Sequence, residues 1–189
     1  MNTTPVSLLE RLCDPGAEQA AWERFVELFT PLLFSWSRQL GLRAEDAADL
    51  VQDVFTTLLQ ELPRFAYDKH RSFRAWLRTV LRNRWRDTCR RRAVLPVRQA
   101  GAPLPDVASP DPIAHFDDTE YRGFLAKRAF AVMQSEFEPV TCTAFRENVI
   151  NCRPAAEVAA ELGITRNAVY LAKARVLRRL REELDGLID

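Results

Sequence analysis

The segment AADLVQDVFTTLLQEL, residues 47–62, decides the fold of the first half of the chain. Its apolar residues recur every three or four positions, which places them on one side of an α-helix. Asp49, Gln52 and Asp53 fall on the opposite side. Pro63 ends the segment, because proline lacks the amide hydrogen that a helix needs. The segment therefore predicts an amphipathic helix with an acidic outer face.

Similar apolar stripes over 19–40 and 73–92 predict two further helices. We expect Pro31 to bend or interrupt the first of them and Ser72 to cap the second. Leu8, Leu9 and Leu12 indicate a short helix to which the sequence assigns no role. Because no segment alternates with period two over the length of a strand, the sequence predicts an all-α protein.

The last part of the chain predicts a helix-turn-helix. Pro154 suits the first position of a helix, and Gly163 can take the positive φ that stops one. Thr165 can cap the next helix, whose apolar stripe runs to Leu184. A short helix, a turn with glycine and a longer basic helix are typical of this motif.

A proline-rich stretch divides the chain. Five prolines within 96–112 exclude a helix there and predict an extended linker. We therefore expect two small helical domains, 1–95 and 121–189, joined by a Pro-rich acidic linker over 96–120.

Charge is distributed unevenly, although the 189 residues carry a net charge of only +1. Residues 64–98 hold twelve basic and two acidic residues, whereas 1–63 and 99–120 are acidic. Residues 165–181 hold six basic residues and no acidic one. A polyanion responds to such local stripes rather than to the net charge.

Several classes of protein are excluded by composition. No apolar run approaches the roughly 20 residues that span a bilayer, and the N-terminus lacks the pattern of a secretory signal. The four cysteines and two histidines show no metal-ligand or disulfide spacing. We therefore expect a reduced cytoplasmic protein without a cofactor or a metal. The acidic side of 47–62 has no third ligand or phosphate loop beside it, so we expect no enzyme.

Two basic segments predict nucleic-acid contacts. Arginines recur every four residues from Arg74 to Arg90, on one face of the 73–92 helix. A solvated face is the alternative, but such faces usually mix charge signs. The rings and cations of 65–73 could stack and hold single-stranded bases, or Phe65 and Phe73 could be core residues. The 165–178 helix could read base edges in a major groove, or it could pack on a partner protein.

These elements together resemble a bacterial RNA polymerase sigma factor of the sigma-70 superfamily, in the short extracytoplasmic-function form. The resemblance rests on DLVQDVF over 49–55, FRAWL over 73–77, Arg82-Asn83 and the motif over 154–181. The YLAK run over 170–173 departs from the family's usual Lys/Arg-Ser-Arg run.

The resemblance implies three binding surfaces. Core polymerase, through its β′ clamp helices, would contact Asp46, Asp49, Gln52, Asp53 and Phe55. The −10 promoter element would contact Arg64, Phe65, Tyr67, Lys69, Arg71, Arg74, Arg78, Arg82, Asn83 and Arg86. The −35 element would contact Thr165, Arg166, Asn167, Tyr170, Lys173, Ala174 and Arg175.

The resemblance also implies further partners. The β flap would bind the apolar remainder of the C-terminal unit, and an anti-sigma protein is a further possible partner. The acidic linker, with Asp106, Asp111, Asp117 and Asp118, would imitate nucleic acid near the RNA exit path.

Three other functions remain open at this point. A stand-alone helix-turn-helix regulator that binds duplex DNA explains 154–181 but not the acidic helix or the arginine row. A small nuclease needs a metal site, which the sequence does not show. A pure protein adaptor predicts that Arg74, Arg78 and Arg82 are replaceable by glutamine.

Overall fold

The computed structural model describes residues 7–14, 16, 19–64, 72–94 and 118–188. Within these ranges the chain forms helices and turns without a β-strand, as the sequence predicts. No described helix is both long enough and apolar enough to cross a bilayer. The proline-rich segment over 96–112 lies outside the described residues.

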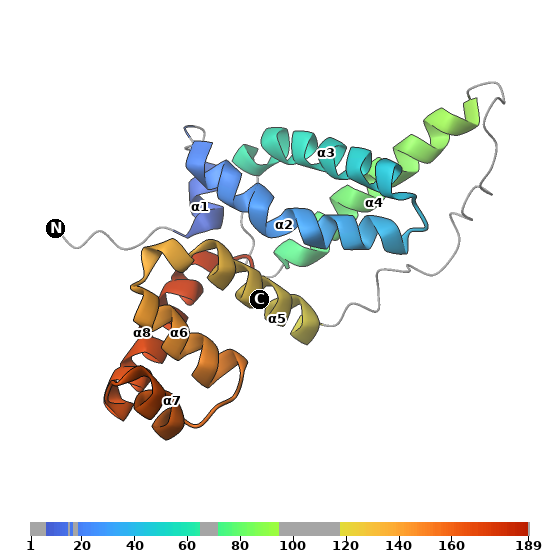
Figure 1. Cartoon of the computed structure of the whole chain (residues 1–189). Helices are drawn as coiled ribbons and strands as arrows, with labels where there is room; N and C mark the ends of the chain where they lie inside the picture. The colour runs from blue at the N-terminus through green and yellow to red at the C-terminus, as the bar shows by residue number, and fades with distance from the viewer. Residues whose placement is uncertain (1–6, 15, 17–18, 65–71, 95–117, 189) are drawn as a thin grey trace.

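The first unit is a bundle of three long helices closed at one end by a short one (Figure 1). Its elements are α1 (Leu8–Cys13), α2 (Gln19–Gln39), α3 (Ala44–Glu61), η1 (Leu62–Arg64) and α4 (Phe73–Val94). The apolar stripes meet in an aromatic centre: Phe25 lies 4.5 Å from Phe29 and 6.2 Å from Phe73, measured between ring centroids. These rings fix α2 against α4.

The second unit begins inside the predicted linker, at Asp118. Its elements are α5 (Asp118–Val132), η2 (Gln134–Glu136), α6 (Pro139–Phe145), the π-helical η3 (Arg146–Ile150), α7 (Ala155–Leu162) and α8 (Arg166–Leu184). A small core of Ala144, Ala155, Val158, Ala159, Val169 and Ala172 holds α6, α7 and α8 together.

Local signals set most helix ends. The hydroxyl of Thr165 accepts a hydrogen bond from the amide of Ala168 at 3.1 Å, and Gly163 has φ of 65°. The hydroxyl of Ser72 accepts from the amide of Ala75 at 3.4 Å. These caps confirm the predicted ends. Helix α7 begins at Ala155, one residue after Pro154.

Of the two effects expected of Pro31, a bend or an interruption, the interruption does not occur: α2 runs unbroken from Gln19 to Gln39. Because Pro31 has no amide hydrogen, the carbonyl of Glu27 loses its partner within the helix. Arg128 of α5 supplies another, since its Nε donates to that carbonyl at 3.1 Å. A contact with the second unit therefore replaces the hydrogen bond that the helix loses at Pro31.

The two units share one continuous apolar core. The large cluster of buried side chains includes Leu8, Leu9 and Leu12 of α1 together with Leu180 and Leu184 of α8. Helix α5 lies along α2, as Figure 1 shows, and Tyr121 of α5 donates to the carbonyl of Leu187 at 3.0 Å. The short helix that the sequence left without a role thus packs at the junction between the units.

Candidate nucleic-acid and partner interface

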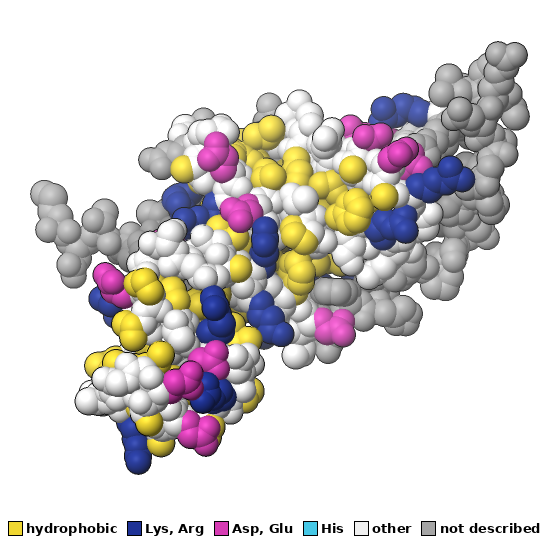
Figure 2. Space-filling view, viewed as in Figure 1, with side chains coloured by type: hydrophobic (Ala, Val, Ile, Leu, Met, Phe, Trp, Pro, Cys, Tyr) yellow, Lys and Arg dark blue, Asp and Glu magenta, His cyan; other side chains and the backbone are white. Residues whose placement is uncertain are grey.

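Helix α3 presents the predicted acidic face. Ala47, Leu50, Val54 and Leu58 are buried, and this orientation leaves three polar side chains exposed: Asp49, Gln52 and Asp53. Asp46 is half-buried. Acidic side chains gather over the start of α3 in the space-filling view, next to Lys and Arg side chains (Figure 2).

Phe55 belongs to the core as well as to the surface of α3. Its ring is half-buried and meets Phe25 edge-on, with 6.1 Å between the centroids. Leu59, one turn further along α3, is 52% exposed. The outer face of α3 therefore joins carboxylates to an apolar end, a composition suited to binding another protein.

The acidic face of α3 borders two arginines of α4 outside the arginine row at a groove. Asp53, Thr56 and Gln60 line one side of it, and Arg84 and Arg91 line the other.

The arginine row of α4 is partly embedded. Arg78, Arg82 and Arg86 are half-buried, whereas Arg90 and the neighbouring Asn83 are exposed. Leu77, Val80, Leu81 and Trp85 turn inward, so the arginines line the outer side of the helix.

Asp87 is the one acid within the arginine row over 73–92. Its carboxylate accepts a hydrogen bond from Arg90, and this bond, with Arg84 and Arg91 nearby, lowers the pKa of Asp87. Asp87 is therefore ionised at neutral pH and compensates part of the charge at this end of the row.

Arg74, the first member of the row, lies apart from the others. Its side chain is only 9% exposed, and its guanidinium carbon sits 5.5 Å from the ring centroid of Tyr121 in α5. Tyr121 of the second unit therefore covers Arg74 in a cation–π contact. The four-residue spacing of the arginines does not reveal this contact.

Part of the predicted −10 surface lies outside the described residues: Phe65, Tyr67, Lys69 and Arg71. Arg64 ends η1, and the structure does not describe its side chain.

Helix α8 presents all the side chains assigned to the −35 surface. Val169, Ala172 and Val176 are buried, so the opposite side is exposed: Thr165, Arg166, Asn167, Tyr170, Lys173, Ala174 and Arg175. Leu171, which the sequence reasoning did not single out, is 61% exposed beside Tyr170 at 57%. The sequence does contain a signal for Leu171: it is an aliphatic residue that lies off the buried stripe of the helix.

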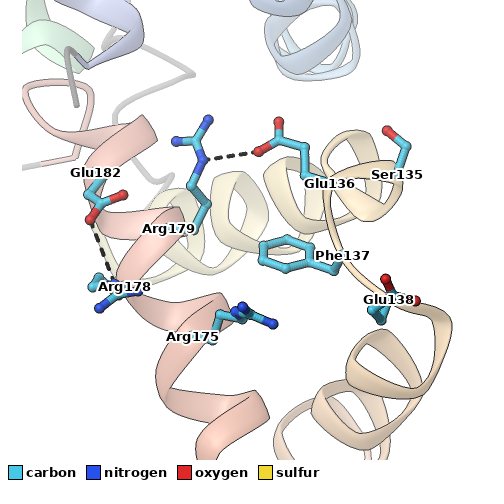
Figure 3. Close-up of a pocket in the computed structure, with 8 residues that line it drawn as sticks. All are labelled: Ser135, Glu136, Phe137, Glu138, Arg175, Arg178, Arg179 and Glu182. Carbon is cyan, nitrogen blue, oxygen red and sulfur yellow. Dashed lines mark hydrogen bonds and ion pairs between the residues drawn. The ribbon is translucent and has the colours of Figure 1, made fainter. Parts of the chain in front are cut away.

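A cavity of about 570 Å³ lies between α8 and the segment 135–138. Figure 3 shows three arginines of α8 beside it, Arg175, Arg178 and Arg179, and Arg179 pairs with Glu136 at 3.0 Å. Glu138 and Glu182 also line the cavity. Because these glutamates offset the arginines, the cavity has no excess of positive charge for a phosphate.

Four cysteines lie within the described residues, and none of them forms a disulfide: Cys13, Cys89, Cys142 and Cys152. Burial raises the pKa of the Cys13 and Cys142 thiols, which keeps both protonated at neutral pH. In the described ranges, His, Cys, Asp and Glu side chains do not gather in threes around a possible metal position.

Residues 25–94 match the family model of sigma-70 region 2, and no curated protein matches the chain. The match takes in α2 from Phe25 onward, α3 and α4, so it covers both the acidic face and the arginine row. It supports a sigma-factor role in RNA polymerase binding and promoter melting, and interaction with core RNA polymerase and promoter DNA. Within 25–94 the chain is therefore similar to sigma-70 region 2.

Proposed function

We propose that this protein is a cytoplasmic, non-enzymatic sigma factor of the extracytoplasmic-function type, which directs core RNA polymerase to promoters with a −10 and a −35 element. The observation that carries the proposal is the region 2 match over 25–94, because this segment contains both an exposed acidic face and a basic helix. A stand-alone regulator has no use for the first of these surfaces.

The α3 face is the proposed docking site for the β′ clamp helices. Asp49, Gln52 and Asp53 supply carboxylates and an amide for a basic partner, while Asp46 and Phe55 complete the edge of the surface. Exposed charge complementarity of this kind accelerates association and selects the partner.

Helix α4 is the proposed contact with the −10 element. Arg78, Arg82 and Arg86 would neutralise phosphates of the opening duplex, and Asn83 lies exposed beside them. Unstacking a base costs a few kcal/mol, which the phosphate contacts and polymerase binding would offset.

Helix α8 is the proposed reader of the −35 element. Arginine recognises guanine edges and asparagine recognises adenine edges, and Arg166 and Asn167 stand exposed in the first turn. Val140 of α6 and Ile150 of η3 are exposed apolar residues of the same unit and are the proposed contacts with the β flap.

Core docking is tested with charge reversal on α3. Asp49→Arg with Asp53→Arg should weaken binding to core polymerase at least tenfold, whereas Glu157→Arg on exposed α7 should not. Fluorescence anisotropy of labelled protein titrated with core enzyme measures both. Equal binding by the double variant and the control would remove α3 from the docking site.

A further inference from the structure

Two large apolar side chains stand exposed on the basic helix α8. Leu171 is 61% exposed and Tyr170 is 57% exposed, more than any other large hydrophobic side chain in the part of the chain that the structure describes. Both lie among cations, because residues 165–181 hold six basic residues and no acidic one. Single exposed apolar residues are common on proteins, but two adjacent ones on a strongly basic helix indicate a contact.

Leu171 belongs to a line of three exposed side chains along α8. Asn167, Leu171 and Ala174 are spaced by four and three residues, which places them on one face of the helix. Val169 and Val176 are buried on the opposite side. The line therefore faces away from the core of the second unit, and we call its three residues the reading line.

Cations flank the reading line on both sides. At 3.6 residues per turn, exposed Lys173 lies about 130° around the helix from the line in one direction, and exposed Arg175 lies about 70° from it in the other. A helix in a major groove turns its outermost face to the base edges and its flanks to the phosphates of the two strands. This charge arrangement favours duplex DNA, rather than a protein, as the occupant of the exposed face.

The reading line has the chemistry that recognises A·T pairs. An asparagine amide pairs with the adenine edge through two hydrogen bonds, and leucine and alanine offer apolar contact to the C5-methyl group of thymine. The side chains of Leu171 and Ala174 form no hydrogen bonds. A guanine or cytosine edge that faced them would lose its bonds to water without replacement.

The spacing along the helix predicts which base pairs these side chains meet. At a rise of about 1.5 Å per residue, Leu171 lies about 6 Å along the axis from Asn167, and Ala174 lies about 4.5 Å beyond Leu171. One base-pair step is about 3.4 Å. Asn167 and Leu171 would therefore face base pairs about two steps apart, and the whole line would span about three steps.

We propose that Leu171 is a specificity-determining residue of α8, which together with Asn167 and Ala174 selects a −35 element built from A·T pairs. Asn167 selects an adenine, and Leu171 selects a thymine about two base pairs away through its methyl group. The inference rests on the proposed function and deepens it, because it names the base pairs that the −35 surface takes.

A promoter library with a randomised −35 element tests the inference. The −10 element is fixed as one that the wild-type protein uses, and a barcode in the transcribed region identifies each promoter. Holoenzyme with the wild-type protein should select an adenine and, about two base pairs from it, a thymine over a cytosine by about fourfold.

Three variants assign each preference to its side chain. Leu171→Gln should remove the thymine preference and keep the adenine preference. Leu171→Met, which stays apolar, should keep both. Asn167→Ala should remove a preference for adenine of at least fivefold and leave the thymine preference unchanged.

The outcomes separate the inference from the proposed function. A thymine preference that survives Leu171→Gln would overturn the inference, as would wild-type selection of G·C pairs alone. An equal loss of transcription from every −35 sequence in Leu171→Gln would also overturn it and would assign Leu171 to a contact with polymerase. The sigma-factor function survives all three results. If the wild-type protein binds a core enzyme but starts no transcript from any promoter, the proposed function itself fails.

Discussion

The arginine row of α4 allows a quantitative prediction about salt. Arg78, Arg82 and Arg86 line one side of the helix, and each is proposed to neutralise one phosphate. The slope of log K against log salt changes by about 0.7 per single-strand contact and about 0.9 per duplex contact. Replacing all three with glutamine should therefore reduce the slope by roughly 2 to 3.

The slope difference is large enough to measure directly. Between 50 and 200 mM salt, a slope difference of 2 to 3 corresponds to roughly 16- to 60-fold. Holoenzyme with the wild-type protein should lose that much more affinity for labelled promoter DNA than holoenzyme with the triple variant. Fluorescence anisotropy across a salt series gives both slopes.

A charge-matched control makes this result specific. Arg38, Arg122 and Lys127 are exposed and lie outside the row, so their joint replacement with glutamine should leave the slope unchanged. Equal slopes for the wild-type protein and the arginine-row variant would refute the phosphate contacts. An equal loss of slope in both variants would show that net charge, not the row, governs binding.

Three further predictions concern single side chains. We expect a preference of about fourfold for thymine over uracil in the −35 duplex, because a methyl group buried against leucine contributes about 0.8 kcal/mol. Leu171→Ala should abolish this preference, which binding to deoxyuridine-substituted templates measures. An unchanged preference would exclude a contact between Leu171 and the thymine methyl group. Thr165→Ala should lower the free energy of unfolding by about 1 kcal/mol through loss of the α8 cap, while Thr165→Ser should restore it, as thermal melts would show. At pH 8, iodoacetamide should alkylate exposed Cys152 before Cys13, because the raised pKa of Cys13 leaves less thiolate until the pH rises further. Mass spectrometry gives the order of alkylation, and the reverse order would contradict the burial of Cys13.

Local patterns were enough to predict most of the helices. The α3 stripe, the Thr165 cap and the Gly163 stop depend on residues a few positions apart, so the sequence contains the whole signal. The exposed side of α8 follows from the same periodicity, because burying Val169 and Val176 turns Tyr170 outward.

Contacts between distant segments could not be predicted in this way. Arg74 shares the spacing of its neighbours, yet Tyr121 covers it. Pro31 stays within a helix, and Arg128, about a hundred residues further along the chain, donates to the Glu27 carbonyl that Pro31 leaves without a partner. Glu183 is a charged residue near the end of a helix, a position that predicts an exposed side chain. Only the packing of α8 against α1 buries it.

Run-off transcription with purified bacterial core polymerase and a promoter library tests the central claim most directly. The account predicts that adding the protein creates new start sites that share a −10 and a −35 element, and that Asp49→Arg with Asp53→Arg abolishes them. Tight duplex binding by the protein alone, with no new transcripts from a core enzyme that it demonstrably binds, would contradict the account.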